Sequence, residues 1–251
     1  MSFFVILLLG LIQGLCEFLP ISSSGHLVLL SSLFGVEESV FISIVLHIAT
    51  LLAVVIVFRK KLIYLIKHPL CLQSKSLIIS TLITCLFGFF FLPFLKNSFS
   101  GAVLPFSFAF TGFLLLLCPM LEKKTRSSLT LKKAVLIGLA QGVALFPGIS
   151  RSGASIAGGL ACGLDRKDSA EFSFLLSVPT ILASLCLELF DLSGGAILNI
   201  NWLALTLSII VAFVVGFVSI KFMMKLIQRA KLKWFSLYLF VLSIASGIIF
   251  W

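Results

Sequence analysis

The stretch LLGLIQGLCEFLPISSSG, from Leu8 to Gly25, returns without a gap as LIGLAQGVALFPGISRSG, from Leu136 to Gly153. Both copies end in a bend rich in Ser and Gly, and these bends are the most polar part of a very apolar chain. The duplication predicts two related halves, about 1–125 and 129–251, with the chemistry at the two bends. The repeated positions, in the first copy, are Gly10, Leu11, Gln13, Gly14, Phe18, Ile21, Ser22, Ser24 and Gly25.

The composition is typical of a membrane protein. Of the 251 residues, 60% are hydrophobic, whereas soluble domains are about 45–50% apolar. The net charge of +10 also suits nucleic-acid binding, but the basic residues cluster between apolar runs and form no stripe with aromatic residues. We therefore expect contact with membrane lipids and no nucleic acid. The six cysteines form no CxxC pair, which favours packing roles over disulfides or a metal cage.

Six apolar runs are long enough to cross the hydrocarbon layer, which takes roughly 17–25 helical residues. Two pairs of shorter runs flank the bends, 3–15 with 23–34 and 131–145 with 151–163. A 13-residue helix covers only about 20 Å, so each pair predicts a re-entrant hairpin that enters and leaves on one side. The long runs are 41–58, 77–95, 103–121, 169–190, 202–222 and 234–251.

The basic residues predict the orientation. All but two of the 19 Lys and Arg residues lie in segments 59–76, 122–133, 164–168 and 221–233, which the positive-inside rule places in the cytoplasm. Both termini are then expected outside. Three long runs separate the bends, and an odd number of spans inverts the second copy. We expect one all-α membrane domain, residues 1–251, with an inverted-topology repeat and a site near the midplane. Segment 59–76, the longest connection, is expected to include a short interfacial helix.

The first bend carries an ionisable side chain at membrane depth. Gln13 and Glu17 are four residues apart and share a helix face. Pro20 ends that helix, and Ser22 or Ser23 can cap the next one, whose first amides are then free. A buried carboxylate in a membrane is costly and is a functional candidate. The alternative for Glu17 is a satisfied interhelical hydrogen bond, and the alternative for the serines is capping alone.

Three further polar residues lie in the apolar runs, where each could have a structural role. His26 lies one turn into the second short run, where it is either structural or able to move a proton near neutral pH. His47, inside the first long run, is expected to pack or to form a hydrogen bond. Glu171 enters the fourth long run and is expected to have a structural role.

The second bend carries a positively charged side chain, that of Arg151. The guanidinium of Arg151 is a planar fork that fits phosphate oxygens, and a helix N-terminus with free amides is itself an anion site. Ser150 and Ser152 offer hydroxyls at the start of the next helix, and Ser155 lies near them. An always-charged guanidinium at this depth needs an anionic partner, which favours a ligand over a purely structural role.

Together the two bends would form a site for a phosphate or diphosphate. Glu17 would repel that ligand unless a divalent cation, Mg²⁺ or Ca²⁺, lay between them with Gln13 as a neutral oxygen ligand. Such a set of groups suits hydrolysis of a phosphoanhydride. The alternative is a polyprenyl-phosphate transporter or flippase, because broken helices in an inverted repeat are also a transporter architecture. Binding alone needs neither a base nor a metal ligand, so Glu17 and His26 favour hydrolysis.

At these bends the sequence resembles the undecaprenyl-diphosphate phosphatase family, bacterial membrane enzymes linked to bacitracin resistance. The resemblance rests on Gln13-x-x-x-Glu17 followed by FLPISSSGH, which ends at His26, and on PGISRSGAS, from Pro147 to Ser155. It covers essentially the whole chain. It implies hydrolysis of undecaprenyl diphosphate to the monophosphate at the outer face of the cytoplasmic membrane, with a divalent cation. The reaction recycles the lipid carrier for peptidoglycan synthesis.

The resemblance implies catalytic roles for Glu17, Ser23, His26 and Arg151. We expect Ser22, Ser150, Arg151, Ser152 and Ser155 to bind the phosphates and Glu17 with Gln13 to hold the cation. Gln13 stands where the family has an acidic or amide residue, which can weaken metal affinity, and Ser155 stands where Thr is usual. His26 acts either as base for water or as activator of Ser23, and the sequence leaves both routes open. The expected partners are a polyprenyl diphosphate and membrane lipids, with a homodimer left open.

Overall fold

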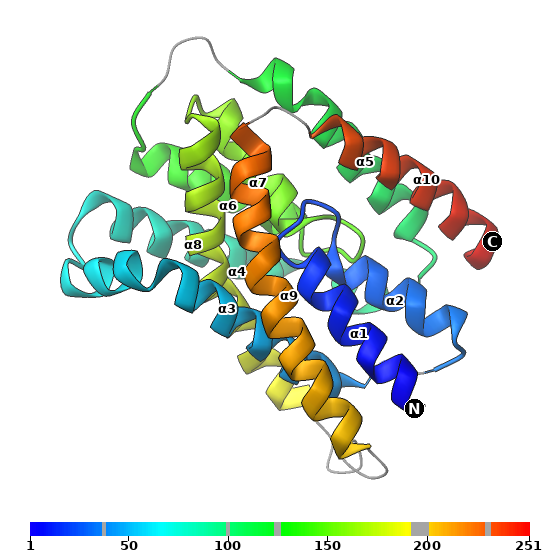
Figure 1. Ribbon diagram of the computed structural model, residues 1–251. Coiled ribbons are helices and arrows are strands. Elements are labelled where there is room, and N and C mark those ends of the chain that lie inside the picture. Colours follow the sequence, from blue (N-terminus) through cyan, green and yellow to red (C-terminus); the bar gives the residue numbers. More distant parts are fainter. Residues whose placement is uncertain (37–38, 99–100, 123–126, 192–200, 229–231) are drawn as a thin grey trace.

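The computed structural model describes residues 1–36, 39–98, 101–122, 127–191, 201–228 and 232–251. Within these ranges the chain forms ten α-helices and no β-strand (Figure 1). Six of them, α3, α4, α5, α8, α9 and α10, are long and apolar enough to cross a membrane, as the sequence predicted. The helices are α1 Phe3–Cys16, α2 Ser23–Leu33, α3 Val40–Lys67, α4 Leu72–Ser98, α5 Leu104–Leu121, α6 Leu131–Val143, α7 Arg151–Ala161, α8 Arg166–Asp191, α9 Trp202–Gln228 and α10 Lys233–Phe250.

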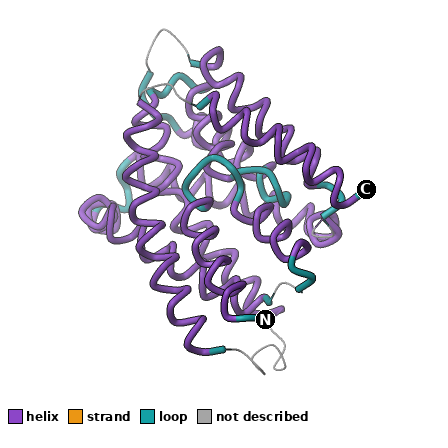
Figure 2. Tube along the Cα trace, turned by 45° about the vertical axis from the view of Figure 1, so that its right-hand side comes forward, coloured by secondary structure: helices purple, strands orange, loops and turns teal. Residues whose placement is uncertain are grey.

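The four short helices form two pairs, α1 with α2 and α6 with α7, and each pair is interrupted at one of the polar bends. Figure 2 shows the connecting loops close together in the middle of the molecule, enclosed by the long helices. The helices α2 and α7 both begin at a serine that caps them, Ser22 and Ser150. The predicted short helices are therefore present, while their re-entrant course through a membrane stays a prediction.

Each half contributes a short helix that packs on a long helix of the other half: α1 lies on α9, and α6 lies on α4. Ser208 of α9 donates to the carbonyl of Ile6 at 2.7 Å, and Ser80 of α4 donates to the carbonyl of Ala134 at the same distance. Both residues of the second contact lie 128 positions from their counterparts, which is the offset of the repeated bends. The internal similarity therefore extends from the sequence into the packing.

Glycines allow the helices of both contacts to approach closely. A β-carbon on Gly10 would collide with the backbone of Ser208, and one on Gly138 would collide with the backbone of Ser80. Without a strong hydrophobic force between helices in lipid, such close backbone approach is a main source of helix association. The repeated glycines therefore fix the position of each bend relative to the opposite half.

Segment 59–76 does include a short helix, as predicted, because α3 breaks at Phe58, where φ is −101° and ψ is 15°, and then continues as a helix to Lys67. The connection itself is shorter than predicted. The connection to α4 spans only residues 68–71. The extension is held by packing, since Leu65 is buried and Lys61 pairs with Glu171 of α8 at 2.7 Å. The expected loops 122–133, 191–201 and 221–233 lie partly outside the described residues.

Replacing Gly10 with Val should destabilise the protein by about 1–3 kcal/mol, because the larger side chain forces α1 away from α9. Gly138→Val should have a similar effect at the contact between α6 and α4. Thermal unfolding of the purified protein in detergent measures both effects. Leu11→Val, at an exposed position of α1, is the matched control, and an unchanged melting temperature in both glycine variants would contradict the close packing.

Candidate active site

The two bends are in direct contact. Ser152 at the start of α7 donates to the carbonyl of Leu19 in the first bend at 3.1 Å. A β-carbon on Gly25 would collide with the Cα of Gly148, which shows how closely the two backbones approach. Phe18 anchors the first bend, because its ring is fully buried and packs edge-on against Phe174 of α8 with centroids 5.8 Å apart. The residues that sequence analysis placed in one site therefore do lie together.

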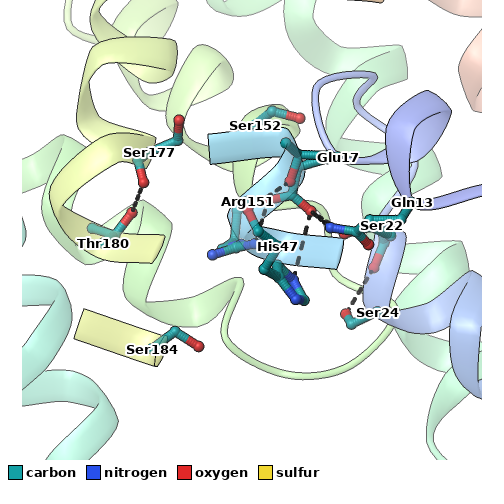
Figure 3. Close-up of polar contacts among 12 residues, drawn as sticks. Gln13, Glu17, Ser22, Ser24, His47, Arg151, Ser152, Ser177, Thr180 and Ser184 are labelled. Carbon is teal, nitrogen blue, oxygen red and sulfur yellow. Dashed lines mark hydrogen bonds and ion pairs between the residues drawn. The ribbon is translucent and has the colours of Figure 1, made fainter. Parts of the chain in front are cut away.

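Glu17 is the residue on which the polar contacts converge (Figure 3). Its side chain is 3% exposed. One carboxylate oxygen accepts hydrogen bonds from Nε2 of Gln13 at 3.0 Å and from the hydroxyl of Ser23 at 2.6 Å. The other oxygen pairs with the guanidinium of Arg151 at 2.5 Å. The carboxylate is thus held by two donors from its own bend and by one cation from the other bend.

A histidine from a long helix also faces Glu17. Nε2 of His47 lies 3.8 Å from the carboxylate of Glu17 (Figure 3). Nδ1 of the same ring lies 2.9 Å from the carbonyl oxygen of Ser43 and therefore carries a hydrogen. Sequence analysis gave His47 a packing or hydrogen-bonding role, because it lies in an apolar run far from either bend. The structure adds it to the surroundings of Glu17.

Both bends are shaped to present helix N-termini. Ser22 has φ of 68°, the one positive value at a non-glycine among the described residues, and such strain of about 1–3 kcal/mol is common at functional sites. Its hydroxyl accepts from the amide of Gly25, and the hydroxyl of Ser150 accepts from the amide of Gly153. The remaining first-turn amides of α2 and α7 have no partner within their own helices. These amides and the dipoles of the two helices favour an anion.

A small polar cavity of about 20 Å³ lies between the bends. Arg151 borders it with a side chain that is 23% exposed, so the guanidinium is accessible to a ligand while remaining paired with Glu17. A cavity of this size has room for about one water molecule, so a phosphate can enter only if side chains around the cavity move. The lining residues are Cys16, Glu17, Ser22, Ser23, Ser24, Ile149, Ser150 and Arg151.

Two serines that were expected to bind phosphate instead hold the second bend in this structure. Ser152 uses its hydroxyl to bond Leu19, and it lies 3.2 Å from the hydroxyl of Ser150. Ser155 lies one turn further along α7, where its hydroxyl donates to the carbonyl of Arg151 and lies 2.6 Å from the hydroxyl of Ser173. Their observed contacts are with other protein groups, and neither serine lines the cavity.

His26 is buried beside the first bend, and both of its ring nitrogens have partners. Nδ1 lies 2.6 Å from the carbonyl oxygen of Ser22, and Nε2 lies 2.8 Å from the hydroxyl of Tyr238 on α10. The hydroxyl of Ser23 is directed to Glu17 and not to His26. Sequence analysis missed Tyr238, because nothing in the apolar run 234–251 distinguishes it from an ordinary residue of a membrane span.

The oxygen atoms needed for a divalent cation are partly present. Oε1 of Gln13 is buried and has no hydrogen-bond partner in the described part of the chain, and it lies on the side chain that contacts Glu17. The described residues contain no group of three or more His, Cys, Asp and Glu side chains able to hold a metal. Glu17 and Gln13 offer oxygen atoms of the kind that Mg²⁺ prefers, and a cation held by these two residues would take its other ligands from substrate and water.

The fold and the site together define a class: a multi-pass helical membrane protein with a polar cavity built around a buried carboxylate and a guanidinium. A family model described as Bacitracin resistance protein BacA matches residues 6–245. The chain belongs to this family.

Curated relatives match along nearly their whole length. The Undecaprenyl-diphosphatase of Carboxydothermus hydrogenoformans is 39% identical over 251 residues, covering 97% of this chain and 96% of the relative. That of Treponema denticola is 38% identical over 267 residues, with 100% and 98% coverage. Undecaprenyl-diphosphatase 4 of Bacillus cereus is 39% identical over 241 residues, with 94% and 93% coverage.

Proposed function

We propose that this protein hydrolyses undecaprenyl diphosphate to undecaprenyl phosphate and inorganic phosphate, and so recycles the lipid carrier for cell-wall synthesis. The observation that carries the proposal is the contact of Glu17 with both Ser23 and Arg151 inside a cavity enclosed by membrane-type helices. A hydroxyl, a proton acceptor and a phosphate-binding cation then meet at one point. The names of the relatives give the substrate.

Arg151 and the N-termini of α2 and α7 bind the diphosphate in this proposal. The guanidinium can form two parallel hydrogen bonds with phosphate oxygens, and the free amides add further donors. These groups also stabilise the charge that develops as the anhydride bond breaks. A phosphate at Arg151 competes with Glu17 for the guanidinium, so substrate binding weakens the ion pair between Glu17 and Arg151.

That competition supports Ser23 as nucleophile. The hydroxyl of Ser23 already donates to Glu17 at 2.6 Å. Once the guanidinium of Arg151 binds the substrate, the carboxylate of Glu17 becomes a better proton acceptor. The oxygen of Ser23 attacks the terminal phosphorus, its proton passes to Glu17, and undecaprenyl phosphate leaves. Water then hydrolyses the phosphoserine. His26 does not activate Ser23, because its two nitrogens bond Ser22 and Tyr238. Its role in this proposal is in the second step, as base for the water that hydrolyses the phosphoserine.

A divalent cation, Mg²⁺ or Ca²⁺, is the proposed cofactor. The carboxylate of Glu17 and the unpartnered Oε1 of Gln13 are the oxygen donors that such ions prefer. When bound, the ion would offset the repulsion between Glu17 and the diphosphate.

The proposed location is the bacterial cytoplasmic membrane, with the site opening and both termini on the outer side. The clustering of basic residues in segments 59–76, 122–133, 164–168 and 221–233 supports this orientation. In this arrangement the α1–α2 hairpin enters from outside and the α6–α7 hairpin from the cytoplasm.

Arg151→Ala should lower phosphate release from a polyprenyl diphosphate by about 10²–10³-fold, the loss usual for removing one group that stabilises developing charge. Arg166→Ala is the matched control, because Arg166 also begins a helix and also pairs with a glutamate, Glu122 at 2.6 Å. The assay measures inorganic phosphate in detergent. Near-normal turnover by the Arg151 variant would refute the phosphate-binding role.

Ser23→Ala should lower turnover by at least about 10³-fold if Ser23 is the nucleophile, as at other covalent sites. Acid quenching during turnover should trap phosphate on Ser23, detectable by mass spectrometry. Ser32→Ala, at an exposed position of the same helix, is the control. An active Ser23 variant without trapped phosphate would favour attack by water instead.

Chelation by EDTA should abolish phosphate release, and added Mg²⁺ or Ca²⁺ should restore it. Gln13→Glu should lower the metal concentration needed for half-maximal activity by about tenfold, because ligand charge sets the affinity of such sites. Gln228→Glu, exposed at the end of α9, controls for the added charge. Full activity in EDTA would remove the cation from the proposal.

A further inference from the structure

His26 is held in a defined tautomer by its two hydrogen bonds. A backbone carbonyl only accepts, so Nδ1, 2.6 Å from the carbonyl oxygen of Ser22, carries the hydrogen. In the neutral ring Nε2 then has a lone pair. The hydroxyl of Tyr238, 2.8 Å away, is the donor to that lone pair. The basic atom of His26 is therefore oriented by a residue 212 positions further along the chain.

Aromatic rings fix the plane of the imidazole as well. The ring of Tyr238 is stacked on His26 with centroids 5.7 Å apart and an interplanar angle of 13°. Phe108 of α5 packs edge-on from another direction, at 5.6 Å and 72°. His26 itself is 6% exposed, whereas Tyr238 is 42% exposed. Tyr238 thus lies at the boundary of the site, with its hydroxyl directed inward.

The position of that hydroxyl is set by the packing of α10 on α5. Ser236 donates to the carbonyl of Gly112 at 2.7 Å, and Ser243 donates to the carbonyl of Pro105 at 2.6 Å. The two serines are seven residues apart, about two helical turns, and they flank Tyr238. Bonds on both sides prevent α10 from rotating about its axis, so the side chain of Tyr238 cannot drift away from His26.

We propose that Tyr238 is a positioning residue for the phosphatase reaction: its hydroxyl donates to Nε2 of His26 and holds the ring in one orientation beside the serine bend. Without the hydroxyl, Nε2 loses its donor and only the bond of Nδ1 to the carbonyl of Ser22 is left to orient the ring. The inference rests on the participation of His26 in the proposed function. It assigns a task to α10, a helix that otherwise packs mainly on α5.

Tyr238→Phe tests the hydroxyl, because it keeps the stacked ring and removes only the oxygen. Its kcat should fall about 10- to 100-fold, the loss seen when the partner that orients a functional histidine is removed at metal sites, while KM stays within about twofold. Tyr238→Leu should be no worse than Tyr238→Phe. If Tyr238→Phe keeps full kcat and only Tyr238→Leu loses it, the role is packing. If Tyr238→Phe is faster than the wild type, the hydroxyl blocks His26. Either result overturns the proposal.

Two measurements separate this inference from the proposed function. In His26→Ala, adding Tyr238→Phe should cause no further loss. Full activity of His26→Ala would remove the role of His26 and this inference with it, whereas an inactive His26→Ala beside a fully active Tyr238→Phe removes this inference alone. Tyr64→Phe is the control, because Tyr64 is the other tyrosine of the chain and is stacked on His68 at an exposed position of α3.

The tautomer can be measured directly in the wild type, so the test does not depend on folding of the variants. Nitrogen-15 spectra of the histidine-labelled protein, assigned with His26→Ala, should place the hydrogen of neutral His26 on Nδ1. Tyr238→Phe should keep the hydrogen on Nδ1, because the carbonyl of Ser22 still accepts it, and should shift the resonance of Nε2, which loses its donor. A hydrogen on Nε2 in the wild type would contradict the proposed hydrogen bond.

Discussion

The pairing of Glu17 with Arg151 is the constraint on which the structure depends. Both are ionisable groups in a chain that is 60% hydrophobic, and they lie 134 positions apart in different halves. Leaving one of them unpaired at such a site costs about 3–5 kcal/mol, so the two bends must meet. The close glycine contacts of α1 with α9 and of α6 with α4 serve the same end, because each brings one bend against the opposite half.

The same pair explains how a stable contact can also be reactive. Arg151 remains accessible from the cavity, while Glu17 is almost fully covered. In the proposed mechanism an incoming phosphate reaches the guanidinium first and draws it away from the carboxylate. Glu17 would not become isolated, since Gln13 and Ser23 donate to it and His47 lies 3.8 Å away. The ligand would thus convert a satisfied carboxylate into a proton acceptor for Ser23 without unfolding the bend.

Much of this fold and site could be predicted from the sequence, because the informative signals are local. The length of apolar runs predicts the six long helices, and the serine bends predict the caps of α2 and α7. The sequence overestimated the length of the connection after α3, because the helix continues past its break at Phe58, held by Leu65 and by the Lys61–Glu171 pair. His47 and Tyr238 could not be predicted as neighbours of Glu17 and His26. Neither lies in a recognisable motif, and both reach the site only through the packing of long helices.

The internal repeat also explains why the two bends must differ. Shifted by 128 positions, Glu17 corresponds to Leu145, Ser23 to Arg151 and His26 to Ala154. Two carboxylates facing each other would repel, as would two guanidinium groups, so a symmetric pair of bends could not be both compact and charged. One half therefore keeps the acid, the hydroxyl and the histidine, and the other half places a cation where the first has its serine. The duplicated sequence supplies two serine-capped helix N-termini, although Ser22 has φ of 68° and its counterpart Ser150 has φ of −79°. The divergence of a few side chains then gives the proposed active site distinct sides for attack and for charge stabilisation.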